Sequence, residues 1–432
     1  MAERDAATPN TPPLTPNTPP TTQAQQPTEQ PPPPPRRNNI AQQQPPRHDN
    51  KAEPPRRDNK AQAPRCQAPR RDGAREAPPR RAWRRLGADG ADAFAVVSYN
   101  VLSQKLLEAH RELYAPWKDC DARRRSAATA RELRGYRAAL LCLQEVEPEF
   151  VDAATGAVAR GARCFAPSAP PRTDGCLVVW DSRTFRCREA SALVLDAGEA
   201  KVNAAAVAAL EHRGGAVLVV ASAHLLFNPN RADLRLKQAV QLLAEVDRLR
   251  RAHAAAGVVL CGDLNASPGS AVYALLARGR VAAAALEERA TTGATTREQP
   301  HAQSGHKGSG TASQPVYDGS DAGGVLESPL GPLASAYAEP LASLPSAAGE
   351  PAFTTYIGRG TKGAVDYVFH AGLRAVGRFE LLPRWLLRQS DGLPAGALAS
   401  DHMALVARFA LPDGPRRRRA DGPNKKPRGV SR

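Results

Sequence analysis

The sequence predicts an α/β fold with two mixed sheets and helices on the outside. Short apolar runs rich in Val, Leu and Ala recur along the chain, and such runs are typical of buried strands. Few helical segments separate them, and some neighbouring runs are joined by hairpin-like turns. Neither a Gly-x-Gly-x-x-Gly sequence nor a P-loop is present, so a Rossmann-type or P-loop nucleotide-binding sheet is not expected.

The first part of the expected core contains three strands and one helix. Residues 94–99 and 138–143 are apolar runs of the strand type. The segment between them, residues 121–136, is rich in Arg, Ala and Leu, as expected of a surface helix. A third apolar run occupies residues 176–180 and follows a short polar loop, which predicts another strand.

The middle of the chain predicts a hairpin, a long helix and a further strand. Residues 204–210 and 216–221 are apolar and flank a turn that contains two adjacent glycines. Residues 233–253 repeat Leu and Val every three or four positions with charges between them, which is the pattern of an amphipathic helix. The apolar run at residues 257–261 is typical of a buried strand.

The later elements are shorter and are separated by a polar segment. Ser267-Pro268 predicts the beginning of a short helix that reaches Leu276. Residues 287–348 are rich in Thr, Ser, Gly and Gln, which predicts a largely disordered insertion. Residues 365–369 and 404–409 are apolar runs that predict the last strands.

Composition limits the folded domain to residues 91–412. Residues 1–90 contain 20 of the 40 prolines and almost no Val, Ile, Leu or Phe, so they form a disordered tail that cannot build a core. Residues 413–432 are basic and lack apolar residues in number, which predicts a second disordered tail.

Most of the formal charge of +16 lies in the two tails. Residues 1–90 carry 16 Lys or Arg against 9 Asp or Glu, and residues 413–432 carry 8 against 2, so the region between them carries only +3. Basic tails attract nucleic acid through its phosphates, but they are also found as solvated linkers without a partner, and both readings stay open. Residues 416–419, four arginines in a row, fit either a nuclear-localisation signal or a solvated basic end.

The cysteines and the hydropathy pattern indicate an intracellular protein. The seven cysteines are odd in number and include no Cys-x-x-Cys pair, which favours reduced thiols and gives no sign of a zinc site. No apolar run reaches the roughly 18 residues of a transmembrane helix, and the N-terminus lacks the apolar core of a signal peptide. We therefore expect a cytoplasmic location, with the nucleus as the alternative, and no membrane association.

Six short motifs place metal-binding or acid–base residues directly after expected strands. They are Ser98-Tyr99-Asn100, Leu143-Gln144-Glu145, Ala223-His224-Leu225, Gly262-Asp263-Leu264-Asn265, Val365-Asp366-Tyr367 and Ser400-Asp401-His402. A single motif of this kind is more often a turn. Carboxylates and imidazoles are costly to bury unless they are paired or bind a metal, so the set of six predicts one converging site.

The residue types suit phosphodiester hydrolysis assisted by a divalent metal. Glu145 is the expected ligand of Mg²⁺, with Asn100 beside it, because this ion takes oxygen ligands and needs few protein carboxylates. Asp263 and Asn265 are two positions apart, so on an extended segment they would face one substrate phosphate together. The alternatives are a strand-end salt bridge for Glu145 and an Asx-turn for the Asp263 motif.

Proton transfer has several candidates. His402, with Asp401 beside it, and Asp263 are expected to activate or steer a water molecule, whereas His224 would donate to a phosphate oxygen. Asp366 would orient a histidine or help to hold the metal, or would be an ordinary buried capping carboxylate. No Gly-x-Ser-x-Gly sequence is present, so catalysis by a nucleophilic serine has no support.

These motifs resemble those of the endonuclease/exonuclease/phosphatase superfamily, which has the DNase I-like fold. Within it, the chain is similar to the branch of nocturnin and the carbon-catabolite-repression deadenylases, and most similar to the Angel family. The most specific sign is the sequence His224-Leu-Leu-Phe-Asn-Pro229, followed by Arg231 and Asp233. The resemblance covers about residues 94–409, apart from the insertion.

The resemblance implies a four-layered α/β sandwich and a Mg²⁺ or Mn²⁺ cofactor held by Glu145. It also implies that nine polar residues line the site: Asn100, Asp174 and Asn203 against the substrate, and His224, Asp263, Asn265, Asp366, Asp401 and His402 in catalysis. The substrates implied are RNA 3′ ends, as in mRNA, attacked by 3′–5′ exonucleolysis or by hydrolysis of a terminal 2′,3′-cyclic phosphate. A lipid or inositol phosphatase and an inactive RNA- or protein-binding scaffold are the alternatives, and no protein partner is predicted.

Overall fold

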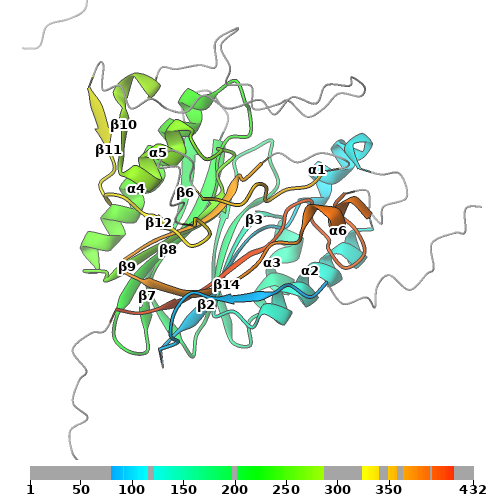
Figure 1. Ribbon diagram of the computed structural model, residues 1–432, viewed down its shortest axis with the longest axis horizontal. Helices are drawn as coiled ribbons and strands as arrows, with labels where there is room; N and C mark the ends of the chain where they lie inside the picture. Colours follow the sequence, from blue (N-terminus) through cyan, green and yellow to red (C-terminus); the bar gives the residue numbers. More distant parts are fainter. Residues whose placement is uncertain are drawn as a thin grey trace, which may run out of the picture. The chain divides into compact units, whose positions relative to one another are not determined.

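Two β-sheets lie face to face between two layers of helices (Figure 1). The computed structural model describes residues 79–90, 92–114, 121–196, 202–286, 324–339, 349–357, 363–389 and 392–412. Helices α2 (Ala122–Tyr136) and α3 (Pro148–Thr155) pack on the outer face of one sheet. Helices α4 (Ala232–Ala252) and α5 (Ala271–Arg278) pack on the outer face of the other. The predicted four-layered α/β sandwich is confirmed.

The first sheet has seven strands. In spatial order they are β1 (Trp83–Arg85), β14 (Arg374–Phe379), β15 (Leu405–Ala410), β2 (Phe94–Asn100), β3 (Leu140–Val146), β5 (Gly175–Asp181) and β4 (Gly161–Pro167). Strands β2 and β3 run parallel to each other, and the other neighbours in this sheet are antiparallel.

The second sheet has six strands. In spatial order they are β12 (Ala334–Ser335), β13 (Asp366–Ala371), β9 (Gly257–Asp263), β8 (Val217–His224), β7 (Val202–His212) and β6 (Phe185–Asp196). Here β8 and β9 form the parallel pair. The remaining elements are β10 (Arg280–Ala282) paired with β11 (Val325–Glu327), the helices α1 (Gln104–Ala109) and α6 (Arg384–Gln389), and the 3-10 turns Arg111–Leu113 and Ala283–Leu286.

Each sheet contributes one parallel pair, and this arrangement positions the polar strand ends. Asn100 lies opposite Gln144 at the carboxyl ends of β2 and β3, and His224 lies opposite Asp263 at the carboxyl ends of β8 and β9. Strand β13 runs antiparallel to β9 and begins at Asp366, directly opposite Asp263. The ends of parallel strands meet at one edge of a sheet, so each sheet collects its functional side chains at a single edge.

Hydrogen bonds between the sheets bring the two edges together. On the face of β7 that lies between the sheets, the small residues Ala204, Ala206 and Ala208 alternate, so the facing sheet can approach β7 closely. The amide group of Gln144 reaches across to the facing sheet, where its Nε2 donates to Ser222 Oγ at 3.0 Å. Glu145 and His224, close in sequence to these two residues, are thereby placed on facing strands of the sandwich.

The predicted strands and helices are all present, with small shifts in their ends. Helix α2 begins after Asp121, whose carboxylate accepts from the Arg124 N–H as an N-cap. The short helix α5 begins at Ala271 rather than at Ser267, because the Ser270 side chain caps it by accepting from Tyr273 N–H. The hairpin of β7 and β8 has the expected antiparallel pairing.

The polar segment at residues 287–348 is more ordered than predicted where the structure describes it. Residues 324–339 contain β11 and β12, and β12 extends the second sheet by pairing with β13. Leu333 and Tyr337 are buried, and the Tyr337 hydroxyl donates to the Val406 carbonyl at 3.1 Å. The predicted insertion is therefore too long by this stretch, and its parts at residues 287–323 and 340–348 lie outside the described residues.

The folded domain begins earlier than the predicted residue 91. Strand β1 pairs antiparallel with β14, with Trp83 opposite Phe379. Beside it, Arg81 donates from Nε to the Glu380 carbonyl at 2.8 Å and from Nη1 to the Ala404 carbonyl at 2.6 Å. Residues 81–85 thus belong to the fold, although they come from a Pro/Arg-rich segment with no apolar run.

We expect Arg81→Ala to lower the free energy of unfolding by about 2 kcal/mol, because partly buried carbonyl oxygens lose their donor. Urea denaturation of the full chain measures this change. Arg80→Ala is the matched control, since Arg80 is exposed. Equal stabilities of the two variants would contradict a structural role for Arg81.

Other sequence predictions concern the thiols, the membrane and the tails. Cys142, Cys164, Cys176, Cys187 and Cys261 are free thiols, in keeping with the prediction, whereas Cys66 and Cys120 lie outside the described residues. Within the part that the structure describes, no helix is both long and apolar enough to cross a membrane. Residues 1–78 and 413–432, including the four arginines, also lie outside the described residues.

Candidate active site

The polar strand ends form one connected cluster. Asn100, Glu145, His224, Asp263, Asp366, Asp401 and His402 are all buried, and each lies close to at least one other member. Asp263 is at the centre: its Oδ2 is 3.0 Å from Asn100 Nδ2 and 3.7 Å from Nε2 of both His224 and His402. The predicted convergence of the six motifs is therefore present in the structure.

Asn100 is a donor to two carboxylates. Its Nδ2 donates to Glu145 Oε1 at 2.9 Å and to Asp263 Oδ2 at 3.0 Å, while its Oδ1 accepts from the Leu102 N–H at 3.0 Å. The backbone bond to Oδ1 fixes which end of the amide faces the carboxylates. This orientation does not support the prediction that Asn100 is a metal ligand, and it gives Asn100 the task of holding Glu145 and Asp263 in place.

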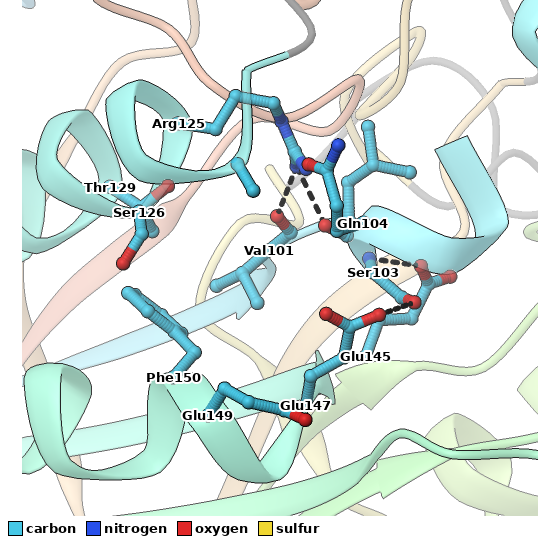
Figure 2. A pocket seen from close by; sticks show the side chains of 12 residues that line it. Val101, Ser103, Gln104, Arg125, Ser126, Thr129, Glu145, Glu147, Glu149 and Phe150 are labelled. Carbon is cyan, nitrogen blue, oxygen red and sulfur yellow. Dashed lines mark hydrogen bonds between the residues drawn. The ribbon is translucent and has the colours of Figure 1, made fainter. Parts of the chain in front are cut away.

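Glu145 is held at a bend in strand β3. Its φ of 56° is left-handed, and the pairing of β3 with β5 shifts register between Leu143 and Val146. The Ser103 N–H donates to Glu145 Oε2 at 3.0 Å, and the Ser103 hydroxyl donates to Glu147 (Figure 2). Burial raises the pKa of Glu145, and the nearby Asp401 raises it further. A buried carboxylate in this position favours a bound cation.

The Asp263 motif combines both alternatives that the sequence left open. Asp263 Oδ1 accepts from the Asn265 N–H at 3.0 Å, which is an Asx-turn, while Oδ2 faces the cluster. Asn265 is not on an extended segment as predicted: its φ is 47°, and its Nδ2 donates to the Leu225 carbonyl at 3.0 Å. Gly262 is required here, because a Cβ would lie 2.2 Å from the Ala223 carbonyl oxygen.

The two histidines have opposite electrostatic surroundings. Burial lowers the pKa of His224 to about 4, against the opposing effect of Asp263, so this imidazole is neutral at pH 7. Burial alone would also lower the pKa of His402, but Asp366, Asp401 and Asp263 together outweigh it and raise the pKa to about 10. His402 therefore favours the protonated form at pH 7, which makes Asp263 the better candidate of the two for the base.

Asp366 and Asp401 hold His402 from two sides. His402 Nδ1 lies 2.9 Å from Asp366 Oδ2, which also accepts from the Thr354 hydroxyl at 2.6 Å. Asp401 Oδ1 lies 4.0 Å from His402 Nε2, and Asp401 Oδ2 accepts from the Tyr114 hydroxyl at 3.2 Å. Asp366 thus orients a histidine, which is one of the two roles that the sequence suggested for it.

Of the two remaining predicted residues, Asp174 lies near this cluster, whereas Asn203 is bonded to helix α4 on the outer face of the second sheet. Asp174, buried just before β5, forms an ion pair with Arg172, whose Nε lies 2.9 Å from Asp174 Oδ1. Both groups act on the pKa of Glu145, which Arg172 lowers and Asp174 raises, so they lie near it. Asn203 Oδ1 accepts from Gln238 Nε2 at 3.3 Å, which holds Asn203 on β7 beside the end of β8.

Sequence patterns did not identify four residues that shape the site, three through their side chains and Ser103 through its backbone N–H. They are Ser103, Tyr114, Arg172 and Thr354. Arg172 had a local signal, because it stands two positions before Asp174. Ser103, Tyr114 and Thr354 are ordinary loop residues whose partners are distant in the sequence, so no local pattern identifies them.

The donor set fits a divalent cation. Two groups have ligand atoms within 4.8 Å of one another: Glu145 with His224 and Asp263, and Asp263 with Asp366 and His402. The buried oxygens Asp366 Oδ1 and Asp401 Oδ1 have no hydrogen-bond partner among the described residues. Unpaired carboxylate oxygens of this kind are costly unless a cation or water satisfies them, and oxygen-rich sites suit Mg²⁺ or Mn²⁺.

The raised pKa of His402 predicts a pH dependence of stability. In the unfolded chain a histidine has a pKa of about 6.5, so charged His402 stabilises the fold fully below that pH, and the contribution is lost as the pH rises towards 10. We expect the difference in unfolding free energy between wild type and His402→Gln to shrink from pH 6.5 to pH 10. Urea denaturation in metal-free buffer measures it, and a pH-independent difference would contradict a charged His402.

The sandwich and its cluster of carboxylates and histidines define the class as a metal-dependent hydrolase. The chain belongs to the Endonuclease/Exonuclease/phosphatase family, whose sequence model matches residues 97–402. The resemblance to this superfamily that the motifs indicated is thereby confirmed.

Similarity to individual proteins agrees with the family. The chain is 29% identical over 356 residues to Carbon catabolite repressor protein 4 homolog 5 of Arabidopsis thaliana, covering 74% of this chain and 78% of that protein. It is 28% identical over 375 residues to Protein angel homolog 2 of Danio rerio, covering 74% and 64%. The crystal structure of ANGEL2, a 2′,3′-cyclic phosphatase, in complex with adenosine-2′,3′-vanadate is similar with a TM-score of 0.60 and 25% identity, covering 76% and 98%.

Proposed function

We propose that this chain is a Mg²⁺-dependent phosphodiesterase that acts on RNA 3′ ends as a 3′–5′ exoribonuclease of the deadenylase type. The observation that carries the proposal is the meeting of three groups: Glu145 and Asp263 at the carboxyl ends of the parallel strand pairs, and His402 in the segment that precedes β15. These groups supply a metal ligand, a proton acceptor and a cation, which are the parts that attack of water on a phosphodiester requires.

The metal would be held by Glu145. Both Glu145 oxygens already accept a hydrogen bond, from Asn100 Nδ2 and from the Ser103 N–H, so the carboxylate has a fixed orientation. When bound, Mg²⁺ supplies a Lewis acid that polarises a phosphoryl oxygen and offsets developing negative charge.

Asp263 is the proposed base. Its Oδ2 is held by Asn100 Nδ2 at 3.0 Å, and its Oδ1 is engaged by the Asn265 N–H, so one oxygen points towards the two histidines. A carboxylate in this position accepts a proton from the attacking water as the new oxygen–phosphorus bond forms, while the bond between phosphorus and the leaving 3′ oxygen breaks and that oxygen takes a proton from solvent.

The cations stabilise the charge that develops on the phosphoryl group. His402, fixed through Nδ1 by Asp366, turns Nε2 towards Asp263 and so towards the place where the phosphate would lie. His224 Nε2 lies at the same distance from Asp263 Oδ2, on the neighbouring strand of the same sheet, as a neutral hydrogen-bonding group. Arg172 adds a charged donor near Glu145. Preorganised donors of this kind stabilise the transition state more than the substrate.

A second candidate function is hydrolysis of a terminal 2′,3′-cyclic phosphate on RNA. The similarity to ANGEL2 favours it, since that protein is a 2′,3′-cyclic phosphatase and its match covers 98% of its chain. The same base and cations would serve, because opening a cyclic phosphate also adds water to a phosphodiester. The two candidates differ only in the bond that is broken.

Three RNAs labelled at the 5′ end separate the candidates: one ending in a run of adenosines, one of mixed sequence, and one ending in a 2′,3′-cyclic phosphate. A ladder that shortens from the 3′ end in Mg²⁺ supports the exoribonuclease, and a faster reaction on adenosines supports a deadenylase. Opening of the cyclic phosphate alone supports the second candidate. No change in any RNA would contradict both, and would favour a lipid or inositol phosphatase or a scaffold.

A further inference from the structure

Arg125 is a buried arginine outside the polar cluster, on the second turn of α2. It is 7% exposed, and its guanidinium points into the loop that follows Asn100 (Figure 2). Nη2 donates to the carbonyls of Val101 at 3.1 Å and Leu102 at 2.6 Å, and Nη1 donates to Gln104 Oε1 at 2.7 Å. One side chain therefore engages three residues of this loop.

The fourth contact of Arg125 reaches a different part of the chain. Its Nε donates to the Ala399 carbonyl at 2.9 Å. Ala399 directly precedes Ser400, whose hydroxyl donates to the Asn100 carbonyl at 2.6 Å and accepts from the His402 N–H at 3.1 Å. Arg125 thus connects the Val101–Gln104 loop with the segment that carries Asp401 and His402.

The loop that Arg125 holds contains a strained residue and donates a hydrogen bond to Glu145, the expected metal ligand. Leu102 has a φ of 59°, a conformation that persists only where neighbouring contacts support it. The next residue, Ser103, supplies the N–H that donates to Glu145 Oε2. If the loop relaxes, Glu145 loses one of the two hydrogen bonds that fix its carboxylate.

We infer that Arg125 is a positioning residue for the metal site, because it fastens the loop that orients Glu145 to the segment that carries Asp401 and His402. The inference rests on the proposed function for its choice of metal. A planar guanidinium is needed, since its fork reaches acceptors on two separate segments, whereas the single ammonium of a lysine reaches fewer of them. Residues that orient a metal ligand typically change metal affinity or activity by about 10- to 100-fold when they are replaced.

The test measures Mn²⁺ binding to the full chain for Arg125→Lys and Arg125→Met, with electron paramagnetic resonance as the method of detection. Arg123→Lys is the matched control, because Arg123 is an exposed arginine of the same helix. We expect Mn²⁺ affinity to fall about 10- to 100-fold in both Arg125 variants and to stay at the wild-type value in the control. Thermal melting records global stability in parallel.

A purely structural role gives a different result. Lower melting temperatures with unchanged Mn²⁺ affinity in the folded Arg125 variants would overturn the inference. Should neither variant fold, Gln104→Met decides, since it removes one acceptor and leaves Arg125 in place; an unchanged Mn²⁺ affinity there would also overturn it. Because the readout needs no RNA, wild-type Mn²⁺ binding without RNA hydrolysis would contradict the proposed function and leave this inference standing.

Discussion

Glu145→Gln is expected to reduce kcat on RNA by at least about 10²- to 10³-fold, the scale of losing a preorganised electrostatic contact in a transition state. The amide keeps the shape of the side chain and can still accept from the Ser103 N–H, but it loses the charge that attracts a divalent cation. Steady-state hydrolysis of 5′-labelled RNA in Mg²⁺ measures the loss, and Mn²⁺ titration measures the accompanying fall in metal affinity.

The same substitution should not destabilise the metal-free protein. Burial raises the pKa of Glu145, so the charged form costs folding free energy at pH 7, and the neutral amide removes that cost. The amide also gives up the bond from Asn100 Nδ2, because its NH2 group cannot accept, so the two effects offset each other and the melting temperature in EDTA is expected to change little. Glu149→Gln is the control, because Glu149 is exposed and lines, together with Glu145, a pocket beside the Val101–Gln104 loop (Figure 2). Wild-type kcat in Glu145→Gln would exclude Glu145 as the metal ligand.

Asp263→Asn is expected to lower kcat by about 10²- to 10⁴-fold, the usual contribution of a general base. The amide cannot take the proton of the attacking water, while KM should stay equal or fall, because a negative charge near the substrate phosphate is removed. Nuclear magnetic resonance titration gives a second readout: the pKa of His402 should fall, since Asp263 is one of the three carboxylates that raise it.

Asp152→Asn is the matched control for this substitution. Asp152 is an exposed residue that forms an ion pair with Arg163, and it is not a member of the polar cluster. Its kcat and the His402 titration should equal those of wild type. An Asp263→Asn variant with full kcat would show that another group accepts the proton.

The sequence predicts the centre of this fold because buried strands leave a strong local signal. Strands β3, β5, β8 and β9 are buried along their whole length or nearly so, and each appears as an apolar run. A polar residue at the end of such an apolar run is easy to recognise in the sequence. Glu145, His224 and Asp263 could therefore be identified as site residues from local patterns alone.

The edges of the sheets could not be predicted in the same way. Strand β6, at the edge of the second sheet, alternates between exposed and half-buried positions and includes Arg186, Arg188 and Glu189. Strand β1 has only exposed residues, and β12 lies in a segment of small and polar residues. These strands form because they are hydrogen-bonded to a neighbouring strand, so their own residues show little of the apolar pattern that predicts a strand.

The electrostatics of the site also depend on contacts between distant residues. His224 is the last residue of β8, and His402 lies shortly before β15. The pKa of His224 is lowered whereas that of His402 is raised, because His402 has Asp366 and Asp401 beside it. The left-handed backbone of Asn265 likewise turns its side chain to Leu225, which spacing alone could not show. Sequence thus predicted the members of the cluster better than their roles.

The most direct test is the initial rate of RNA 3′-end hydrolysis by the full chain as a function of Mg²⁺ concentration, starting from EDTA-treated protein. We expect no hydrolysis in EDTA and a rate that rises with Mg²⁺ to saturation, with Glu145→Gln inactive over the same range. Hydrolysis that continues in EDTA, or none at any Mg²⁺ or Mn²⁺ concentration, would contradict a metal-dependent RNA 3′-end phosphodiesterase at this site.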